Sequence, residues 1–125
     1  MRTTWWRTSS EDSTRCDVSD PVVVLSALGA PHDAERIARA LVDERLAACV
    51  NIVPDVVSIY RWNGNVEQEP ELMLVIKTLA ERVEALKARL VQLHPYELPE
   101  VVVIPIGGGH APYLAWIEEQ VRPLP

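Results

Sequence analysis

Two short runs of uncharged, largely β-branched residues lie far apart in this chain. They are Val22–Leu28 (VVVLSAL) and Val101–Ile106 (VVVIPI). Runs of this length and composition are typical of strands in a buried sheet. The pattern therefore predicts one early strand and one late strand.

Two longer extended runs lie between these strands and are separated by a turn signal. The runs are Cys49–Trp62 and Val66–Lys77, and Asn63 and Gly64 stand between them. Asn-Gly is a preferred pair in a two-residue hairpin loop, since both of its residues tolerate a positive φ. The sequence therefore predicts a long β-hairpin in the middle of the chain.

Apolar residues at helical spacing predict three helices. A buried helix face requires an apolar residue every three or four positions. The first helix follows a loop at Gly29–Asp33, and its apolar positions are Ala34, Ile37, Ala38, Leu41 and Val42. The third begins at Pro112, because proline suits the first turn of a helix, and it closes the chain.

The second of these helices has the clearest start and stop signals. Thr78 and Glu81 have the spacing of a capping box, in which side chains bond the free backbone N–H groups of the first turn. An apolar stripe follows at Val83, Leu86, Leu90 and Leu93. Pro95 then ends the helix, because proline lacks the donor that a helix interior needs.

The predicted elements follow the order β-α-β-β-α-β-α. This is the order of an α+β, ferredoxin-like βαββαβ sandwich with an extra C-terminal helix. The sheet of such a fold is antiparallel and carries both crossover helices on one face. The opposite face must be covered by something else.

The predicted hairpin is longer than the domain that carries it. Its second strand has twelve residues, from Val66 to Lys77, and spans roughly 40 Å when straight. A domain of this size is only roughly 33 Å across. Because an overhanging end would expose apolar side chains and unpaired backbone groups, the sequence predicts a homo-oligomer. Pro54 and Pro70 fit an edge, a bend or a bulge better than long continuous pairing.

Composition divides the chain at Pro21. Residues 1–20 are rich in Ser, Thr, Asp, Glu and Arg and have no apolar period, which predicts a disordered N-terminal tail. Residues 21–125 form the predicted folded domain. A chain of this length builds one hydrophobic core without disulfides or a structural metal.

Charge and cysteine content narrow the classes of partner and the compartment. The chain has 12 basic and 18 acidic residues, a formal net charge of −6, which repels nucleic acid. Cys16 and Cys49 lie far apart without a CxxC motif, as expected in a reducing compartment. No segment has the length of a membrane span or the apolar core of a signal peptide. We therefore expect a cytoplasmic protein without nucleic-acid or membrane partners.

Five segments match one known family in order and spacing. They are VVVLSAL (Val22–Leu28), ERLAACVNI (Glu44–Ile52), SIYRWNGNVEQEPELMLVIKT (Ser58–Thr78), HPYELPE (His94–Glu100) and YLAW (Tyr113–Trp116). With them the chain resembles the CutA divalent-cation tolerance family. The resemblance implies a tight homotrimer whose long hairpins pair across subunits, and a role in tolerance of copper and other divalent cations. It implies no established enzymatic activity, and the residues add no clear nucleophile with its base.

The fold also looks like that of the PII nitrogen-signalling proteins, whose trimers bind nucleotides and small anions between subunits. This likeness implies an alternative function, a PII-like module that binds a small anionic ligand at the subunit clefts. Arg61 and Lys77 are the basic candidates for such a cleft, and Tyr60 and Trp62 would cover the ligand. A simpler interpretation buries both rings in the trimer contact.

The metal site that the resemblance implies is incomplete in this chain. In the family, copper binding is attributed to a Cys on the first strand and two adjacent His residues at the end of the second helix. The matching positions are Ser26, Leu93 and His94. Because Ser and Leu are poor ligands for copper, we expect copper or another divalent ion to bind weakly at His94, with Glu97 and Glu100. In the alternative, His94 is structural and caps the last carbonyls of the helix.

Overall fold

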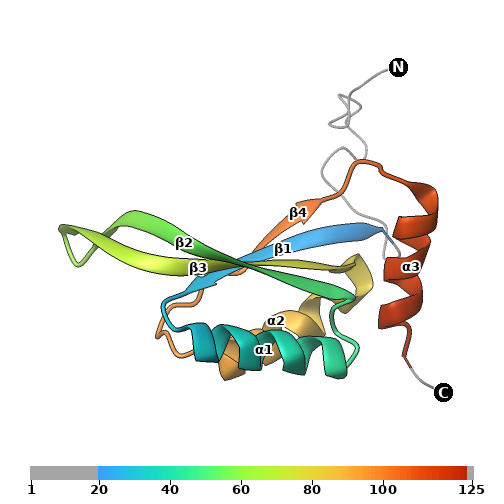
Figure 1. Cartoon of the computed structure of the whole chain (residues 1–125), viewed down its shortest axis with the longest axis horizontal. Coiled ribbons are helices and arrows are strands. Elements are labelled where there is room, and N and C mark those ends of the chain that lie inside the picture. Colours follow the sequence, from blue (N-terminus) through green and yellow to red (C-terminus); the bar gives the residue numbers. More distant parts are fainter. Residues whose placement is uncertain (1–19, 124–125) are drawn as a thin grey trace.

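The computed structural model describes residues 20–123, so almost all of the predicted disordered tail, residues 1–20, lies outside the described residues. The elements follow the predicted order (Figure 1). They are β1 (Pro21–Leu28), α1 (Pro31–Asp43), β2 (Cys49–Trp62), β3 (Asn65–Leu79), α2 (Val83–Leu93), β4 (Val102–Pro105) and α3 (Ala111–Val121). A 3-10 turn, Ala80–Arg82, precedes α2.

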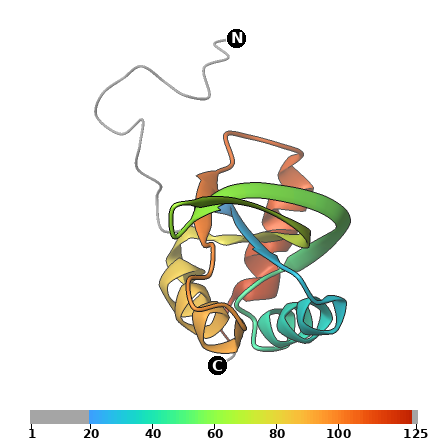
Figure 2. The same ribbon diagram turned by 90° about the vertical axis from the view of Figure 1, so that its left-hand side faces the viewer.

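The four strands form one antiparallel sheet in the order β2-β3-β1-β4. In this order β3 is inserted between β1 and β2, as in the split βαβ arrangement of ferredoxin-like folds. Helices α1 and α2 lie on one face of the sheet, and α3 packs at the end away from the hairpin tip (Figures 1 and 2). The predicted α+β, ferredoxin-like fold with an extra C-terminal helix is confirmed.

The hydrophobic core lies between the sheet and helices α1 and α2. Side chains of a strand alternate between its two faces, so Val22, Val24 and Leu28 of β1 point to the helices and are fully buried. They pack with Ala34, Ile37, Leu41, Leu74, Ile76, Leu86 and Leu90. A smaller cluster joins α3 to the end of the sheet through Ala48, Leu79, Ile117 and Val121.

The starts of two helices differ from the prediction. Strand β3 continues to Leu79, so Thr78 is still in the sheet, and its buried Oγ1 donates a hydrogen bond to the Leu46 carbonyl at 2.8 Å. Helix α2 then begins through the 3-10 turn without a side-chain cap. The predicted capping box was wrong because an acceptor distant in sequence engages the Thr hydroxyl. Helix α1 begins earlier than predicted, at Pro31, a residue that suits the first helical position.

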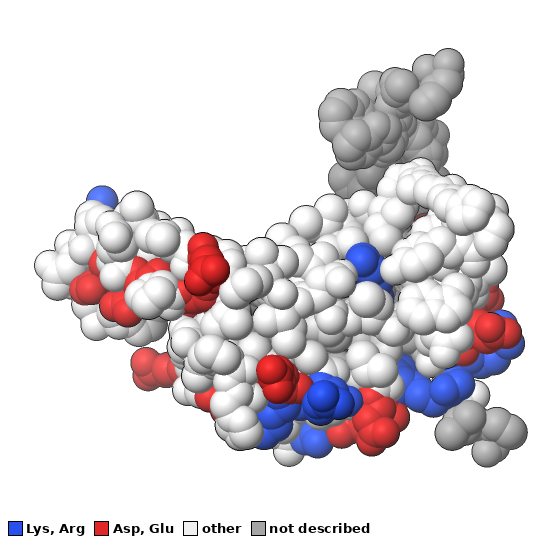
Figure 3. All heavy atoms as spheres, viewed as in Figure 1, with Lys and Arg blue, Asp and Glu red and all other residues white. Residues whose placement is uncertain are grey.

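The hairpin extends well beyond the rest of the sheet. Strand β1 pairs with β3 only over Leu72–Leu79, so the seven residues 65–71 of β3 pair only with residues 56–62 of β2. These two segments are termed the arm. Seven residues span roughly 23 Å, so the predicted overhang is confirmed. Figure 1 shows the arm projecting from the domain, and Figure 3 shows acidic side chains gathered on it.

Local backbone geometry shapes both ends of the arm. At its tip, Asn63 and Gly64 have φ values of 51° and 82°, as the predicted two-residue turn requires. At its base, a bulge in β2 contains Pro54 and Asp55, and Asp55 has a φ of 61°. A bulge bends a strand and increases its twist. Pro54 therefore lies in the kind of position that its missing donor predicts.

Two buried hydroxyls on the helix-facing side of the sheet provide a test of how the core is packed. Ser26 Oγ is fully buried and has no hydrogen-bond partner among residues 20–123, whereas Thr78 Oγ1 is satisfied. We predict that Ser26→Ala raises the free energy of unfolding by about 1 kcal/mol, because it removes a buried unsatisfied hydroxyl. Thr78→Val, the matched control, should lower it by about 1 kcal/mol. Urea unfolding at one protein concentration measures both, and a less stable Ser26→Ala protein would contradict the prediction.

Candidate functional site

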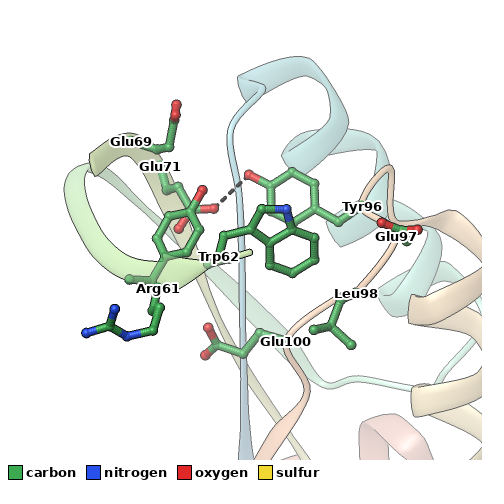
Figure 4. Close-up of a pocket in the computed structure, with 10 residues that line it drawn as sticks. Arg61, Trp62, Glu69, Glu71, Tyr96, Glu97, Leu98 and Glu100 are labelled. Carbon is green, nitrogen blue, oxygen red and sulfur yellow. Dashed lines mark hydrogen bonds between the residues drawn. The ribbon is translucent and has the colours of Figure 1, made fainter. Parts of the chain in front are cut away.

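A cavity of about 530 Å³ lies beside the arm (Figure 4). Its walls come from the arm, from Ala27 in β1 and from the connection between α2 and β4. Three aromatic rings line it, those of Tyr60, Trp62 and Tyr96. The cavity is termed the arm pocket, and it is the candidate site with the most varied chemistry in the described part of the chain.

The side chains of a strand alternate between its two faces, and this alternation places most of the arm residues that line the pocket on one face of the arm. Tyr60 and Trp62 alternate along β2, and Glu69 and Glu71 alternate along β3. The register pairs Tyr60 with Glu67, so both sets of alternate residues project from the same face of the arm. The aromatic rings and the carboxylates therefore face the arm pocket together.

The opposite wall is held by one short hydrogen bond. The hydroxyl of Tyr96 donates to Glu71 Oε2 at 2.7 Å, which joins the connection after α2 to the arm. Desolvation raises the pKa of Tyr96 well above its usual value of 10.0, and the hydrogen bond to Glu71 raises it further. The neutral, donating form of Tyr96 is thus the one that the folded chain favours.

His94 fixes the start of the same connection. Its ring is buried, with Nε2 2.9 Å from the Ala27 carbonyl oxygen, and its Nδ1 accepts a hydrogen bond from the Tyr96 N–H at 3.1 Å. Because Nδ1 accepts, the proton lies on Nε2 and is donated to Ala27. The ring therefore holds β1 and the connection together instead of capping the last carbonyls of α2.

The arm pocket has an excess of negative charge. Four carboxylates line it, those of Glu69, Glu71, Glu97 and Glu100. One cation, Arg61, opposes them, and Figure 4 shows its guanidinium directed away from Trp62. Desolvation raises the pKa of Tyr60, and the nearby glutamates of β3 raise it further. The pocket electrostatically favours a cation over an anion.

The residues predicted as metal ligands do not converge on one centre. Glu97 and Glu100 line the arm pocket, but both nitrogens of His94 are hydrogen-bonded to backbone groups. Ser26 is buried in the core, and no group of three His, Cys, Asp or Glu side chains within residues 20–123 is arranged to hold a metal ion. This donor set does not fit a high-affinity transition-metal site.

The two residues predicted for an anion cleft are far apart in one chain. Arg61 pairs with Val66 near the hairpin tip, whereas Lys77 pairs with Cys49 at the start of β2. The twelve steps along β2 between these pairs span roughly 40 Å. Lys77 also donates a hydrogen bond to Asn51 Oδ1 at 2.8 Å. One subunit therefore forms no cleft from Arg61 and Lys77.

Sequence reasoning assigned no site to three polar residues of the arm pocket, Glu69, Glu71 and Tyr96. A signal was present for the glutamates, because Glu67, Glu69 and Glu71 alternate along a predicted strand and must share a face. Their meeting with Tyr96 depends on where the connection after α2 packs. That position is set by tertiary contacts.

The Tyr96 hydrogen bond predicts a dependence of stability on alkaline pH. A raised pKa in the folded state gives stability that is fully present below the unfolded value of 10.0 and is lost as pH rises above it. We expect the free energy of unfolding of the wild type to fall more steeply above about pH 10 than that of Tyr96→Phe. Urea unfolding between neutral and alkaline pH measures this difference. Equal slopes for the two proteins would show that Tyr96 does not contribute.

Comparison with known proteins points to a single family. A family model described as CutA1 divalent ion tolerance protein matches residues 22–120. A divalent-cation tolerance protein CutA from Thermus thermophilus is 50% identical over 97 residues, which are 78% of this chain and 94% of that protein. A rice relative, 39% identical over 81% of this chain and 57% of its own length, is named as chloroplastic. The cytoplasmic location therefore stays a prediction. Separately, no helix within residues 20–123 is long and apolar enough to cross a membrane.

Solved structures agree with this family. The crystal structure of CutA from Xylella fastidiosa has a TM-score of 0.81 and 44% identity, covering 83% of this chain and 100% of that one. The divalent cation tolerance protein from Thermus thermophilus has a TM-score of 0.80 and 48% identity, covering 82% and 99%. The match in sequence, fold and length leads to one conclusion: this chain belongs to the CutA divalent-cation tolerance family.

Proposed function

We propose that this protein is a homotrimeric CutA protein that acts in divalent-cation tolerance in the cytoplasm and binds divalent metal ions weakly. One observation carries the assembly: the arm and strand β4 present apolar side chains that this chain leaves uncovered. The role in divalent-cation tolerance rests on membership of the family. The proposed protein partners are two further copies of the chain. The acidic net charge argues against nucleic acid, and we assign no membrane partner and no catalytic role.

The apolar side chains of the arm share one face. Val57 and Ile59 alternate along β2, and the register pairs Arg61 with Val66, so Val66 projects from that same face. Val57, Ile59 and Val66 are 62%, 66% and 66% exposed. This face is opposite the one that carries Tyr60 and Trp62. Three large aliphatic side chains so exposed favour cover by another protein surface.

Strand β4 offers a second uncovered surface. It is the last strand of the sheet, so one of its edges is unpaired in a single chain. Val102, Val103 and Ile104 are all exposed on it. Edge strands of this kind pair readily with another chain. An arm that reaches from one copy to a different surface of the next makes a head-to-tail contact, and such contacts form a ring when the rotation between copies closes. The likeness to the family supports a ring of three.

The oligomeric state tests the proposal directly. Native mass spectrometry should report three chains for the wild type, and Val57→Asp combined with Ile59→Asp should yield monomers, because two carboxylates would be buried in the contact. Val91→Asp is the matched control, since Val91 is 47% exposed on α2, away from the arm. It should remain trimeric. A wild-type protein that is monomeric at micromolar concentration would overturn the assembly.

Metal affinity is the second test. We expect Cu(II) and Zn(II) to bind with micromolar or weaker affinity through Glu97 and Glu100, with little selectivity, because carboxylates and water are hard oxygen ligands that these two ions do not prefer. In calorimetric titrations, Glu97→Gln with Glu100→Gln should abolish the heat of binding. His94→Ala should leave the affinity within about twofold while lowering the melting temperature, because His94 bonds the backbone through both nitrogens.

Two results would change this assignment. A nanomolar affinity that is lost in His94→Ala would make His94 a ligand and would require its ring to leave the Ala27 and Tyr96 contacts. Unchanged binding in the double glutamine variant would place the metal elsewhere. Circular dichroism of each variant separates lost binding from lost folding.

The alternative function, a PII-like module for a small anion, has less support. It needs Arg61 and Lys77 in one cleft, and only an assembly could bring these residues of different subunits together. The carboxylates of the arm pocket would repel an anion at the arm. We therefore retain divalent-cation tolerance as the proposed function.

A further inference from the structure

We propose that the arm pocket binds an organic ammonium ion, with the positive head held among carboxylates and aromatic rings. The inference goes beyond the proposed function. Residues of one chain line the pocket, and two of them, Glu97 and Glu100, are also the proposed metal ligands, so a metal ion and an ammonium ion would compete for it. The inference rests on the combination of chemical groups in the walls and on their arrangement.

The aromatic rings are the observation that separates an organic cation from a metal ion. Tyr60, Trp62 and Tyr96 all line the arm pocket, and each is about two-fifths exposed. A ring face attracts an ammonium group through its quadrupole, and Trp does so most strongly. The carbon face of a ring offers no lone pair to a divalent metal ion. Walls with three rings therefore favour an ammonium group with carbon substituents.

The carboxylates supply the charge that such a cation needs. Within residues 20–123, Glu69, Glu97 and Glu100 form no ion pair, while Glu71 accepts the hydrogen bond of Tyr96. The four carboxylates do not form a group arranged to hold a metal ion. They are spread along the pocket, as suits a ligand larger than a bare ion. A cation inside the pocket would be attracted to these carboxylates through partly screened Coulomb forces.

The size and rigidity of the pocket fit a small organic molecule. Its volume of about 530 Å³ lies within the range of ordinary ligand pockets. The ring of Tyr96 is held in place by its hydroxyl bond to Glu71 and by its edge-to-face contact with the buried ring of His94, whose centroid is 4.7 Å away. A wall that is already fixed costs little ordering entropy when a ligand binds.

A charged small molecule and an uncharged analogue of the same shape provide the test. Choline and 3,3-dimethylbutan-1-ol have the same shape, but the alcohol has a carbon in place of the positively charged nitrogen. In titrations of the full-length protein followed by calorimetry, choline should bind at least tenfold more tightly. Trp62→Leu should weaken choline binding about threefold to thirtyfold, and Trp62→Phe should weaken it less, because the ring is kept.

Variants that remove a carboxylate complete the design. Glu97→Gln should weaken choline binding at least threefold, since it removes one carboxylate from the wall. Glu35→Gln is the matched control, because Glu35 is exposed on α1 and does not line the arm pocket. It should change the affinity less than twofold. Thermal unfolding and native mass spectrometry of each variant confirm that folding and assembly are unchanged.

Three outcomes would overturn the proposal. Choline and its neutral analogue could bind equally, which would make the pocket merely apolar. A folded wild-type protein could fail to bind millimolar choline. A divalent metal ion could occupy the pocket with an affinity that falls in Glu97→Gln but not in Trp62→Leu, and choline could fail to displace it. The last outcome would support the metal proposal while rejecting this one.

Discussion

The pairing between β1 and β3 is the constraint on which the rest of this structure depends. It ends at Leu72, whereas β2 pairs with β3 as far as the turn, so the seven residues of each hairpin strand nearest the turn have only each other as partners. The arm that results has two faces and no core beneath it. One face carries Val57 and Ile59 and favours another protein surface, while the other carries Tyr60 and Trp62 and forms one wall of a pocket.

The second wall of that pocket is joined to the core by His94. The ring of this residue holds the end of α2 close to β1, and its Nδ1 orders the backbone at Tyr96. Tyr96 then reaches the arm through Glu71. A histidine that resembles a metal ligand in sequence thus has a structural role in the fold, because a buried ring must satisfy both nitrogens and does so here with backbone groups.

Local patterns predicted the elements of this fold well, because each has a strong local cause. The Asn63–Gly64 turn and the β-branched early strand are examples. Features that depend on distant partners were predicted poorly. Thr78 has the spacing of a cap, but its hydroxyl bonds the Leu46 carbonyl, an acceptor distant in the sequence. The acidic pocket was missed for the same reason, since its glutamates come from two segments that only tertiary packing brings together.

The central claim is that another copy of the chain covers the arm. Hydrogen–deuterium exchange of the backbone amides in residues 56–62 tests it most directly, because β2 is the outer strand and half of its amides point away from β3. If the arm is covered, these outward amides exchange slowly, at rates close to those of the inward amides in the same strand. If they exchange as fast as amides of an unpaired strand while the inward ones stay protected, the arm is free in solution and the account of the assembly is wrong.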